Sequence, residues 1–224
     1  MKIFDFEIEK IIKSKRKTIS LAVLPNGKLE LKTPNKISEK QIEEIILRHQ
    51  RWIVKRQQNL LENMYTPKTF YEGEKLLLLG NEYSLKFVKG LKLPEIRDNF
   101  IIIDNEKHDN LHDFFTFWYR EFAFKIFKER IDGYSKIMNL QYDSLKISNA
   151  KTRWGSCSSK KNINLSWRLI MAPMKIVDYV IIHELAHLKE LNHSPKFWAV
   201  VEGAMPDYKI YRSWLKKNGH TLSF

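Results

Sequence analysis

The stretch HELAHLKELNH, residues 183–193, carries three histidines and a glutamate at fixed offsets. His183 and His187 are four residues apart, so on an α-helix their rings lie one turn apart on nearly the same side and can reach one ion. Glu184 points about 100° away around the helix, which places its carboxylate beside the ion rather than on it. There it could take a proton from metal-bound water. The pattern therefore predicts a catalytic metal site.

A third ligand requires the chain to turn after this helix. In a continuous helix His193 would lie about 9 Å farther along the axis, out of reach of the ion. Asn192 tolerates the left-handed conformation that closes helices, and Ser194-Pro195 is a good start for a new helix. His193 then lies on a tight link and can fold back onto the ion. Three histidines with one open water position are typical of catalytic zinc, so Zn²⁺ is the expected cofactor.

The elements around this motif should bury it. The segment MKIVDYVIIHELAHL follows Pro173, which is tolerated in the first turn of a helix, and it is apolar nearly all round. Residues 144–171 have strand character. Residues 162–169 are a candidate for a strand edge that aligns an extended substrate, and an ordinary interior strand is the other interpretation.

A long helix is predicted before these strands, capped by Asp109 or Asn110 and running to about residue 139, with Gly133 as its weak point. Apolar and aromatic residues at helical spacing define its expected buried face: Leu111, Phe114, Phe115, Trp118, Phe122, Ile126 and Ile131. These aromatic residues are expected to form core rather than to bind a cofactor.

The N-terminal part has the pattern of hairpins and one helix. Residues 6–33 alternate apolar and polar types around Asn26-Gly27, and residues 75–88 do so around Gly80-Asn81, before a strand at 100–104. Ser38 to Gln41 form a capping-box pattern that opens an amphipathic helix. Its expected apolar stripe contains Ile42, Ile45, Ile46, His49, Trp52 and Ile53, which makes His49 a helix-face residue rather than a metal ligand.

These elements predict an α+β fold. We expect N-terminal β-hairpins and a helix, residues 1–108, packed on a mostly helical zincin-like core with a small sheet, residues 109–224. Both parts are expected to form one compact unit. The oligomeric state cannot be predicted from these patterns.

Composition restricts the protein class. The 224 residues are 43% hydrophobic, enough for a substantial core, and Cys157 is the sole cysteine, so no intrachain disulfide is possible. We find neither a signal peptide nor an apolar run of the roughly 18 residues that span a bilayer, so we expect a cytoplasmic protein without a membrane partner. The net charge of +13, with 14 basic and 7 acidic side chains in residues 1–60, favours either nucleic-acid binding or a solvated basic face.

Several motifs together resemble the YgjP-like family of zinc metallopeptidases, in the zincin group. They are RWGSC (153–157), NINLSWRL (162–169), DYVIIHELAHL (178–188), NHSPKFW (192–198) and PDY (206–208). The resemblance covers nearly the whole chain and is densest from 150 to 215. It implies zinc at His183, His187 and His193, with Glu184 as the catalytic acid/base and a peptide or protein as substrate.

Three functions are compatible with this pattern. The leading one is zinc-dependent peptide hydrolysis, with Glu184 as general base. A metal-dependent endoribonuclease shares the histidine spacing but lacks this glutamate and has glycine at the position of Glu190; a protease of nucleic-acid-bound proteins, as in the related SprT-like proteins, would also suit the charge. A zinc-stabilised interaction module without catalysis is the third. Metzincins too have glycine at the position of Glu190, so the turn here should fall later.

Other residues could have roles near the site. Glu202 resembles the acid that gluzincins use as third ligand, but we expect it to be an outer partner of the site or a core-edge residue. Cys157 is expected to be a small packed residue, since nothing places a histidine beside it. The unranked candidates for a donor to the developing oxyanion are Arg153, Tyr208, Tyr211 and His220.

Overall fold

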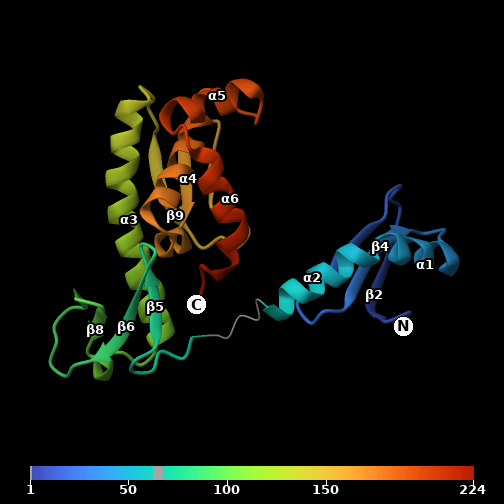
Figure 1. Ribbon diagram of the computed structural model, residues 1–224, viewed down its shortest axis with the longest axis horizontal. Helices are drawn as coiled ribbons and strands as arrows, with labels where there is room; N and C mark the ends of the chain where they lie inside the picture. Colours follow the sequence, from blue (N-terminus) through green and yellow to red (C-terminus); the bar gives the residue numbers. More distant parts are fainter. Residues whose placement is uncertain (1, 63–67) are drawn as a thin grey trace. The chain divides into compact units, whose positions relative to one another are not determined.

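The computed structural model describes residues 2–62 and 68–224, and the chain divides into two compact units, Met1–Tyr65 and Thr66–Phe224 (Figure 1). The division lies well before the expected boundary near residue 108. Its physical reason is burial: Phe70, Leu76 and Ile101 belong to the same apolar cluster as the helices of the C-terminal half. A separate cluster forms the core of the first unit.

The first unit contains a mixed sheet of β1 (Lys2–Ile3), β2 (Phe6–Ser14), β3 (Ser20–Val23) and β4 (Leu29–Pro34), in the order β1-β2-β4-β3. β3 and β4 form the predicted antiparallel hairpin, and its turn residue Gly27 has a φ of 79°. A positive φ at this turn explains the Asn-Gly sequence. β2 joins β4 in parallel, a pairing that the hairpin pattern did not indicate.

Two helices follow where one was predicted: α1 (Glu39–Arg48) and α2 (Gln50–Glu62). The capping box of Ser38 and Gln41 starts α1 as expected. The helix ends at His49, whose backbone leaves the helical conformation (φ −102°, ψ 9°). Ile42, Ile46 and Ile53 are buried, whereas His49, at the break between the two helices, and Trp52 are exposed.

The second unit begins with a sheet of β5 (Lys75–Leu78), β6 (Asn81–Phe87), β7 (Glu95–Arg97) and β8 (Phe100–Ile103), in the order β5-β6-β8-β7, followed by η1 (Asn105–Lys107). The predicted β5–β6 hairpin is confirmed. Its turn is hydrogen-bonded to a later segment: Leu79 N–H donates to the Ile170 carbonyl (2.7 Å), and Gly80 N–H donates to the Met171 carbonyl (3.0 Å). Gly80 has a φ of 81°, and a Cβ there would lie 2.7 Å from Pro173 Cγ.

The long predicted helix is α3 (Leu111–Ile137), capped by the Asn110 side chain. Gly133 does not interrupt it. Its fully buried residues recur every four positions, so the buried face is rotated relative to the expected one: Phe115, Tyr119, Ala123, Phe127 and Ile131. Arg130 forms a bidentate ion pair with the buried Asp178 (both N···O distances 2.7 Å), which joins α3 to the buried helix α4 (Met174–Ala186).

A third sheet contains β9 (Ser144–Ser148), β10 (Gly155–Cys157) and β11 (Asn162–Ser166), in the order β10-β11-β9. β11 is therefore an interior strand, and residues 162–169 are not a free edge. The segment η2 (Trp167–Met171) is a 3₁₀-helix instead of the predicted strand. It leads through Pro173 into α4 (Met174–Ala186), followed by α5 (Pro195–Ala204), α6 (Tyr208–Asn218) and η3 (Gly219–Thr221).

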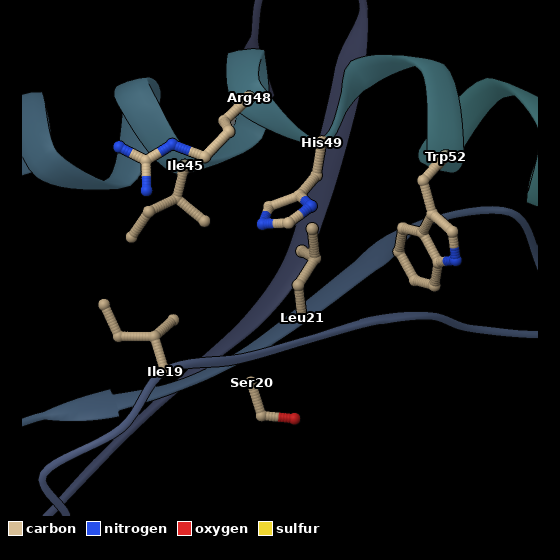
Figure 2. A pocket seen from close by; sticks show the side chains of 7 residues that line it. All are labelled: Ile19, Ser20, Leu21, Ile45, Arg48, His49 and Trp52. Carbon is tan, nitrogen blue, oxygen red and sulfur yellow. The ribbon is translucent and has the colours of Figure 1, made fainter.

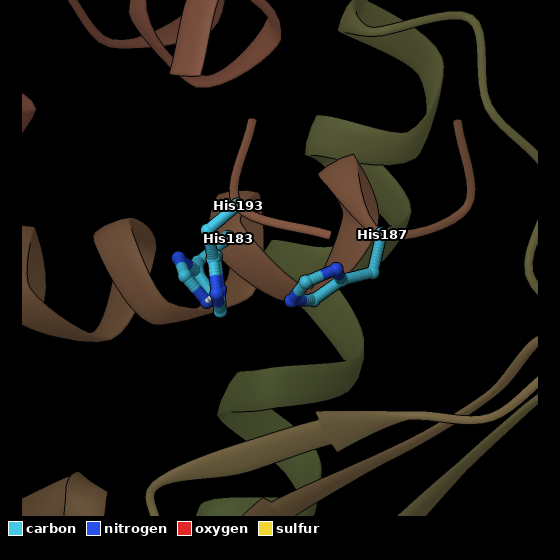
Figure 3. Close-up of side chains that lie close together, drawn as sticks. All are labelled: His183, His187 and His193. Atoms are coloured by element: carbon cyan, nitrogen blue, oxygen red, sulfur yellow. Dashed lines mark hydrogen bonds between the residues drawn. The ribbon is translucent and has the colours of Figure 1, made fainter. Parts of the chain in front are cut away.

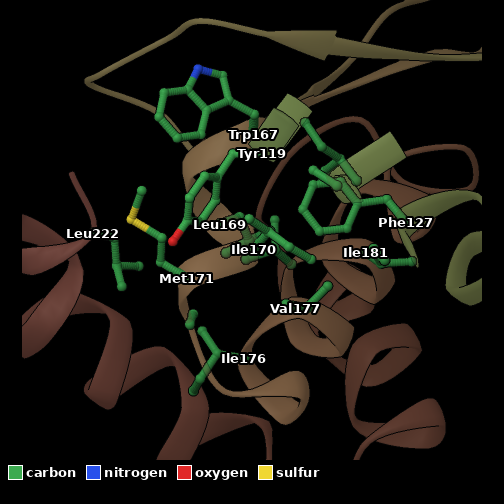
Figure 4. Packing of buried hydrophobic residues seen from close by; sticks show 14 of the residues in the cluster. Tyr119, Phe127, Trp167, Leu169, Ile170, Met171, Ile176, Val177, Ile181 and Leu222 are labelled. Carbon is green, nitrogen blue, oxygen red and sulfur yellow. The ribbon is translucent and has the colours of Figure 1, made fainter. Parts of the chain in front are cut away.

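The core of the second unit lies around η2 and α4, as Figure 4 shows. All five residues of η2 are buried, and α4 is buried on nearly every side, as its all-round apolar sequence predicted. The helix that carries the first two histidines is thus held on both faces. The fold as a whole is a mixture of α-helices and small β-sheets, in agreement with the α+β prediction.

Candidate metal centre

The three predicted histidines lie together, with one ring nitrogen of each within 4.8 Å of the others (Figure 3). His183 and His187 lie on consecutive turns at the end of α4, and His193 reaches them from the link that follows. The Nε2 atoms of His183 and His193 are 3.0 Å apart. Two nitrogens on a tetrahedral zinc ion lie about 3.3 Å apart, so the His183–His193 distance fits a shared ion, and the cluster of three can hold a metal.

The link turns as tightly as the sequence predicted. α4 ends at Ala186, and its carbonyl accepts hydrogen bonds from the N–H groups of Lys189 and Glu190, both at 3.0 Å. Ser194 caps α5 by accepting from Phe197 N–H, with proline in the first turn. The expected left-handed residue at Asn192 was wrong, because no residue from 188 to 193 has a positive φ.

The orientation of His187 is set by the link itself. Its Nδ1 donates to the carbonyl oxygen of Glu190, 3.2 Å away, because a carbonyl can only accept. The proton is thereby held on Nδ1, and Nε2 keeps its lone pair for a metal. Burial lowers the pKa of His187, which favours the neutral form that a metal requires.

The His183 ring is buried but has few hydrogen-bond partners in the protein. Burial, aided by the two neighbouring histidines and by Arg212, lowers the pKa of His183 to about 3. Its Nδ1 is buried without a hydrogen-bond partner among the residues described here, and its Nε2 faces only another imidazole. A buried polar atom left unpaired costs about 1–3 kcal/mol. The donor set therefore fits a metal ion better than it fits a purely structural role.

Phe197, on α5, lies against all three imidazoles. Its ring centroid is 4.9 Å from that of His183, 4.6 Å from His187 and 4.7 Å from His193, and the side chain is fully buried. Trp198 stacks on His193 at 5.6 Å. Both belong to the NHSPKFW motif, yet the sequence pattern gave no reason to single them out.

Glu184 is buried, with 5% of its surface exposed, and its carboxylate lies over Gly155 at the start of β10. A Cβ built on Gly155 would be 2.4 Å from Glu184 Oε1. Burial raises the pKa of Glu184 to about 7, while the positive charge of Arg153 acts in the opposite direction. A carboxyl group with a pKa near neutrality can both accept and release a proton, as general acid–base catalysis requires.

The other residues considered from the sequence have different surroundings in the structure. Glu202 is exposed and lies 3.8 Å from Lys209, so it is neither an outer partner of the histidines nor part of the core edge. Burial and the charge of Glu184 raise the pKa of the half-buried Cys157, which keeps its thiol protonated. Tyr208 is buried and stacks on Trp198.

Arg212, which the sequence analysis missed, is a further cation near the site. Its guanidinium lies 4.6 Å from the Trp198 ring centroid, and its charge lowers the pKa of His183. The positive charge of Arg153 acts on Glu184 and lowers the pKa of its carboxyl. His220 is exposed on η3. Arg153 and Arg212 are therefore the cations whose charge reaches the candidate site.

Two histidines on a buried helix, a third on the next link and a buried carboxylate are typical of metal-dependent hydrolases. The family comparison agrees: the model described as "YgjP-like, metallopeptidase domain" matches residues 17–218. The chain belongs to the YgjP-like metallopeptidase family.

Comparison with curated proteins gave no match. Among solved structures, the chain is similar to the metallopeptidase zymogen of Pyrococcus abyssi abylysin (26% identity, 40% of this chain and 93% of that chain, TM-score 0.37). It is also similar to the metallopeptidase zymogen of Methanocaldococcus jannaschii jannalysin (21% identity, 39% and 93%, TM-score 0.34). Within the described residues, no helix is long and apolar enough to cross a membrane.

Proposed function

We propose that this protein hydrolyses peptide bonds with a zinc ion held by His183, His187 and His193 and with Glu184 as general base. The observation that carries the proposal is the approach of three imidazole nitrogens to within 4.8 Å, beside a buried carboxyl. The family places the chain among metallopeptidases, and an all-histidine donor set is one that zinc favours.

The chain's own groups would divide the work as follows. A zinc ion bound there would supply the Lewis acid that activates water and polarises the scissile carbonyl. Glu184 would accept the proton of the attacking water on its carboxylate and deliver it to the leaving amine nitrogen. Burial around Glu184 supports this role because it holds the pKa of the carboxyl near 7.

β10 is the best candidate for the strand that aligns an extended substrate. Among the described strands it pairs only with β11, so its other edge is open to pairing. Gly155, at its start, lies directly against the Glu184 side chain. A peptide added to this edge would run beside the carboxyl that acts on it, and main-chain hydrogen bonds would hold it there.

The test compares the purified protein with its Glu184→Gln variant. We expect zinc in both proteins by metal analysis, cleavage of casein by the wild type, and loss of this activity by several orders of magnitude in the variant. A chelator should abolish cleavage, and added zinc should restore it.

The same preparations should be given single-stranded RNA. Cleavage of RNA but not of casein would replace the proposal with a metal-dependent endoribonuclease. Full retention of casein cleavage in Glu184→Gln would remove Glu184 from the mechanism. Zinc binding without cleavage of any substrate would favour an interaction module.

A further inference from the structure

The N-terminal unit contains a groove whose lining includes none of the candidate site residues. It has a volume of about 730 Å³ and lies between β3 and the α1–α2 junction (Figure 2). Residues from both sides line it: Ile19, Ser20, Leu21, Ile45, Arg48, His49 and Trp52. We call it the β3 groove.

One wall of the β3 groove is an unpaired strand edge. β3 is the last strand in the order β1-β2-β4-β3 and pairs only with β4 among the strands described. On its outer edge, every second residue presents a backbone N–H and C=O to solvent. Such an edge accepts another extended chain.

The opposite wall is helical and runs alongside the strand. Gln57, near the end of α2, donates to the carbonyl of Gly27 in the β3–β4 turn (2.7 Å), which fixes α2 along the hairpin. Trp52, one to two turns earlier, is 46% exposed, and Ile19 on the strand side is 37% exposed. Exposed apolar side chains on both walls favour an occupant with apolar side chains of its own.

One cation, Arg48, lines the β3 groove, and further basic residues belong to the same chain segments. Lys15 and Lys17 lie on the loop before β3, and Arg51 and Lys55 lie on α2, where they line a separate hollow. None of these five forms an ion pair with any described residue. Glu44, one turn before Arg48, is the nearest acid along α1, and it too has no ion pair in the described parts. The unit as a whole has 14 basic and 8 acidic residues.

We propose that the β3 groove binds an extended, acidic protein segment by strand addition to β3. The backbone edge would provide main-chain hydrogen bonds, and Ile19, Leu21 and Trp52 would contact alternate apolar side chains. Arg48, together with the positive charge of the unit, would attract carboxylates. A single-stranded nucleic acid fits the charge, but it offers no strand of alternating donors and acceptors to β3. The residues that line the groove belong to the first unit and the metal centre belongs to the second, so the proposal does not rest on the proposed peptidase activity.

The test uses the full-length protein in the presence of chelator, which removes cleavage as a complication. The probe is a fluorescein-labelled peptide of about ten residues that alternates valine and glutamate, and binding is read by anisotropy. We expect saturable binding that weakens with salt and falls at least about tenfold in Arg48→Glu and in Trp52→Ala. Lys36→Glu makes the same charge change outside the groove and should have little effect.

Hydrogen exchange identifies the mode of binding. The bound peptide should slow amide exchange in residues 19–23, and melting temperatures verify that each variant is folded. If Trp52→Ala does not fold, Ile19→Asp replaces it. The proposal is overturned if the peptide does not bind, if a valine–lysine peptide binds equally well, or if Lys36→Glu weakens binding as much as Arg48→Glu. It is also overturned if residues 19–23 are not protected, or if single-stranded DNA binds the groove and the acidic peptide does not.

Discussion

The side chain of Glu184 occupies the space in which residue 155 would carry a β-carbon. An added Cβ on Gly155 would lie 2.4 Å from Oε1, 2.6 Å from Cγ and 2.7 Å from Cδ of Glu184. Gly155 has no positive φ, so alanine would be acceptable to the backbone, and the three atoms nearest to the added Cβ all belong to the Glu184 side chain. The glycine thus fixes where the proposed general base lies.

This contact predicts that Gly155→Ala displaces the Glu184 carboxyl while leaving the histidines in place. Peptidase activity should fall by about 100-fold, because displacements on the order of 1 Å have effects of this size, while zinc content is retained. Gly203→Ala is the matched control, since a Cβ there meets nothing within 4 Å. Equal activity in both variants would mean that Glu184 tolerates the displacement.

Metal binding should distinguish His193 from Glu202. Loss of an outer-shell partner already costs about 10–100-fold in metal affinity, so removal of a direct ligand in His193→Ala should cost more. Glu202→Ala should bind zinc like the wild type, because its exposed carboxylate contacts Lys209. Titration with a competing chelator measures both. Unchanged affinity in His193→Ala would reject the three-histidine site.

Phe197 should influence the metal through the orientation of the histidines. We expect Phe197→Leu to weaken zinc binding by about tenfold, as loss of other orienting contacts does. Phe127→Leu is the control, because Phe127 is equally buried but lies in α3 and contacts none of the three rings. Both variants should be destabilised to denaturant. Only the first should lose affinity for zinc.

The raised pKa of Glu184 predicts a pH dependence of stability in the metal-free protein. The pKa of Glu184 in the folded protein is about 7 and the ordinary value of a glutamate is 4.5, so the stabilisation is present below pH 4.5 and is lost as the pH rises through 7. Relative to wild type, Glu184→Gln should therefore gain roughly 3 kcal/mol between about pH 4.5 and pH 8. His183, whose lowered pKa acts in the opposite sense as pH falls from 6.5, is common to both proteins. Urea unfolding in the presence of chelator measures the difference in unfolding free energy between the two proteins. This difference should not change with pH if the Glu184 carboxyl has an ordinary pKa.

The sequence was most informative where local spacing decides geometry. Residues four apart on a helix must lie on consecutive turns, and a capping Ser-Pro pair must start a new helix, so the gathering of the three histidines could be foreseen. The residues that pack against the histidines and Glu184 could not be foreseen. Phe197 and Gly155 reach the site from other elements, and only the packing of α5 and β10 on α4 brings them there.

Fold features that depend on tertiary context were predicted less well. Residues 162–166 have the pattern of a strand, but β10 and β9 flank it on both sides, and pattern alone does not reveal how strands are ordered. The break at His49 likewise has no glycine or proline to signal it. Residues before 108 were assigned to the N-terminal part because hairpin patterns do not show which core they join.

The hydrogen bonds from Leu79 and Gly80 to Ile170 and Met171, just before α4, determine where a shortened version of this protein can begin. A fragment trimmed to begin after residue 108 would keep His183, His187, His193 and Glu184, yet it would remove the two backbone donors to Ile170 and Met171 and uncover Pro173. A minimal fragment for activity measurements must therefore start upstream of Phe70, so that it retains the β5–β6 hairpin, which packs against the start of α4.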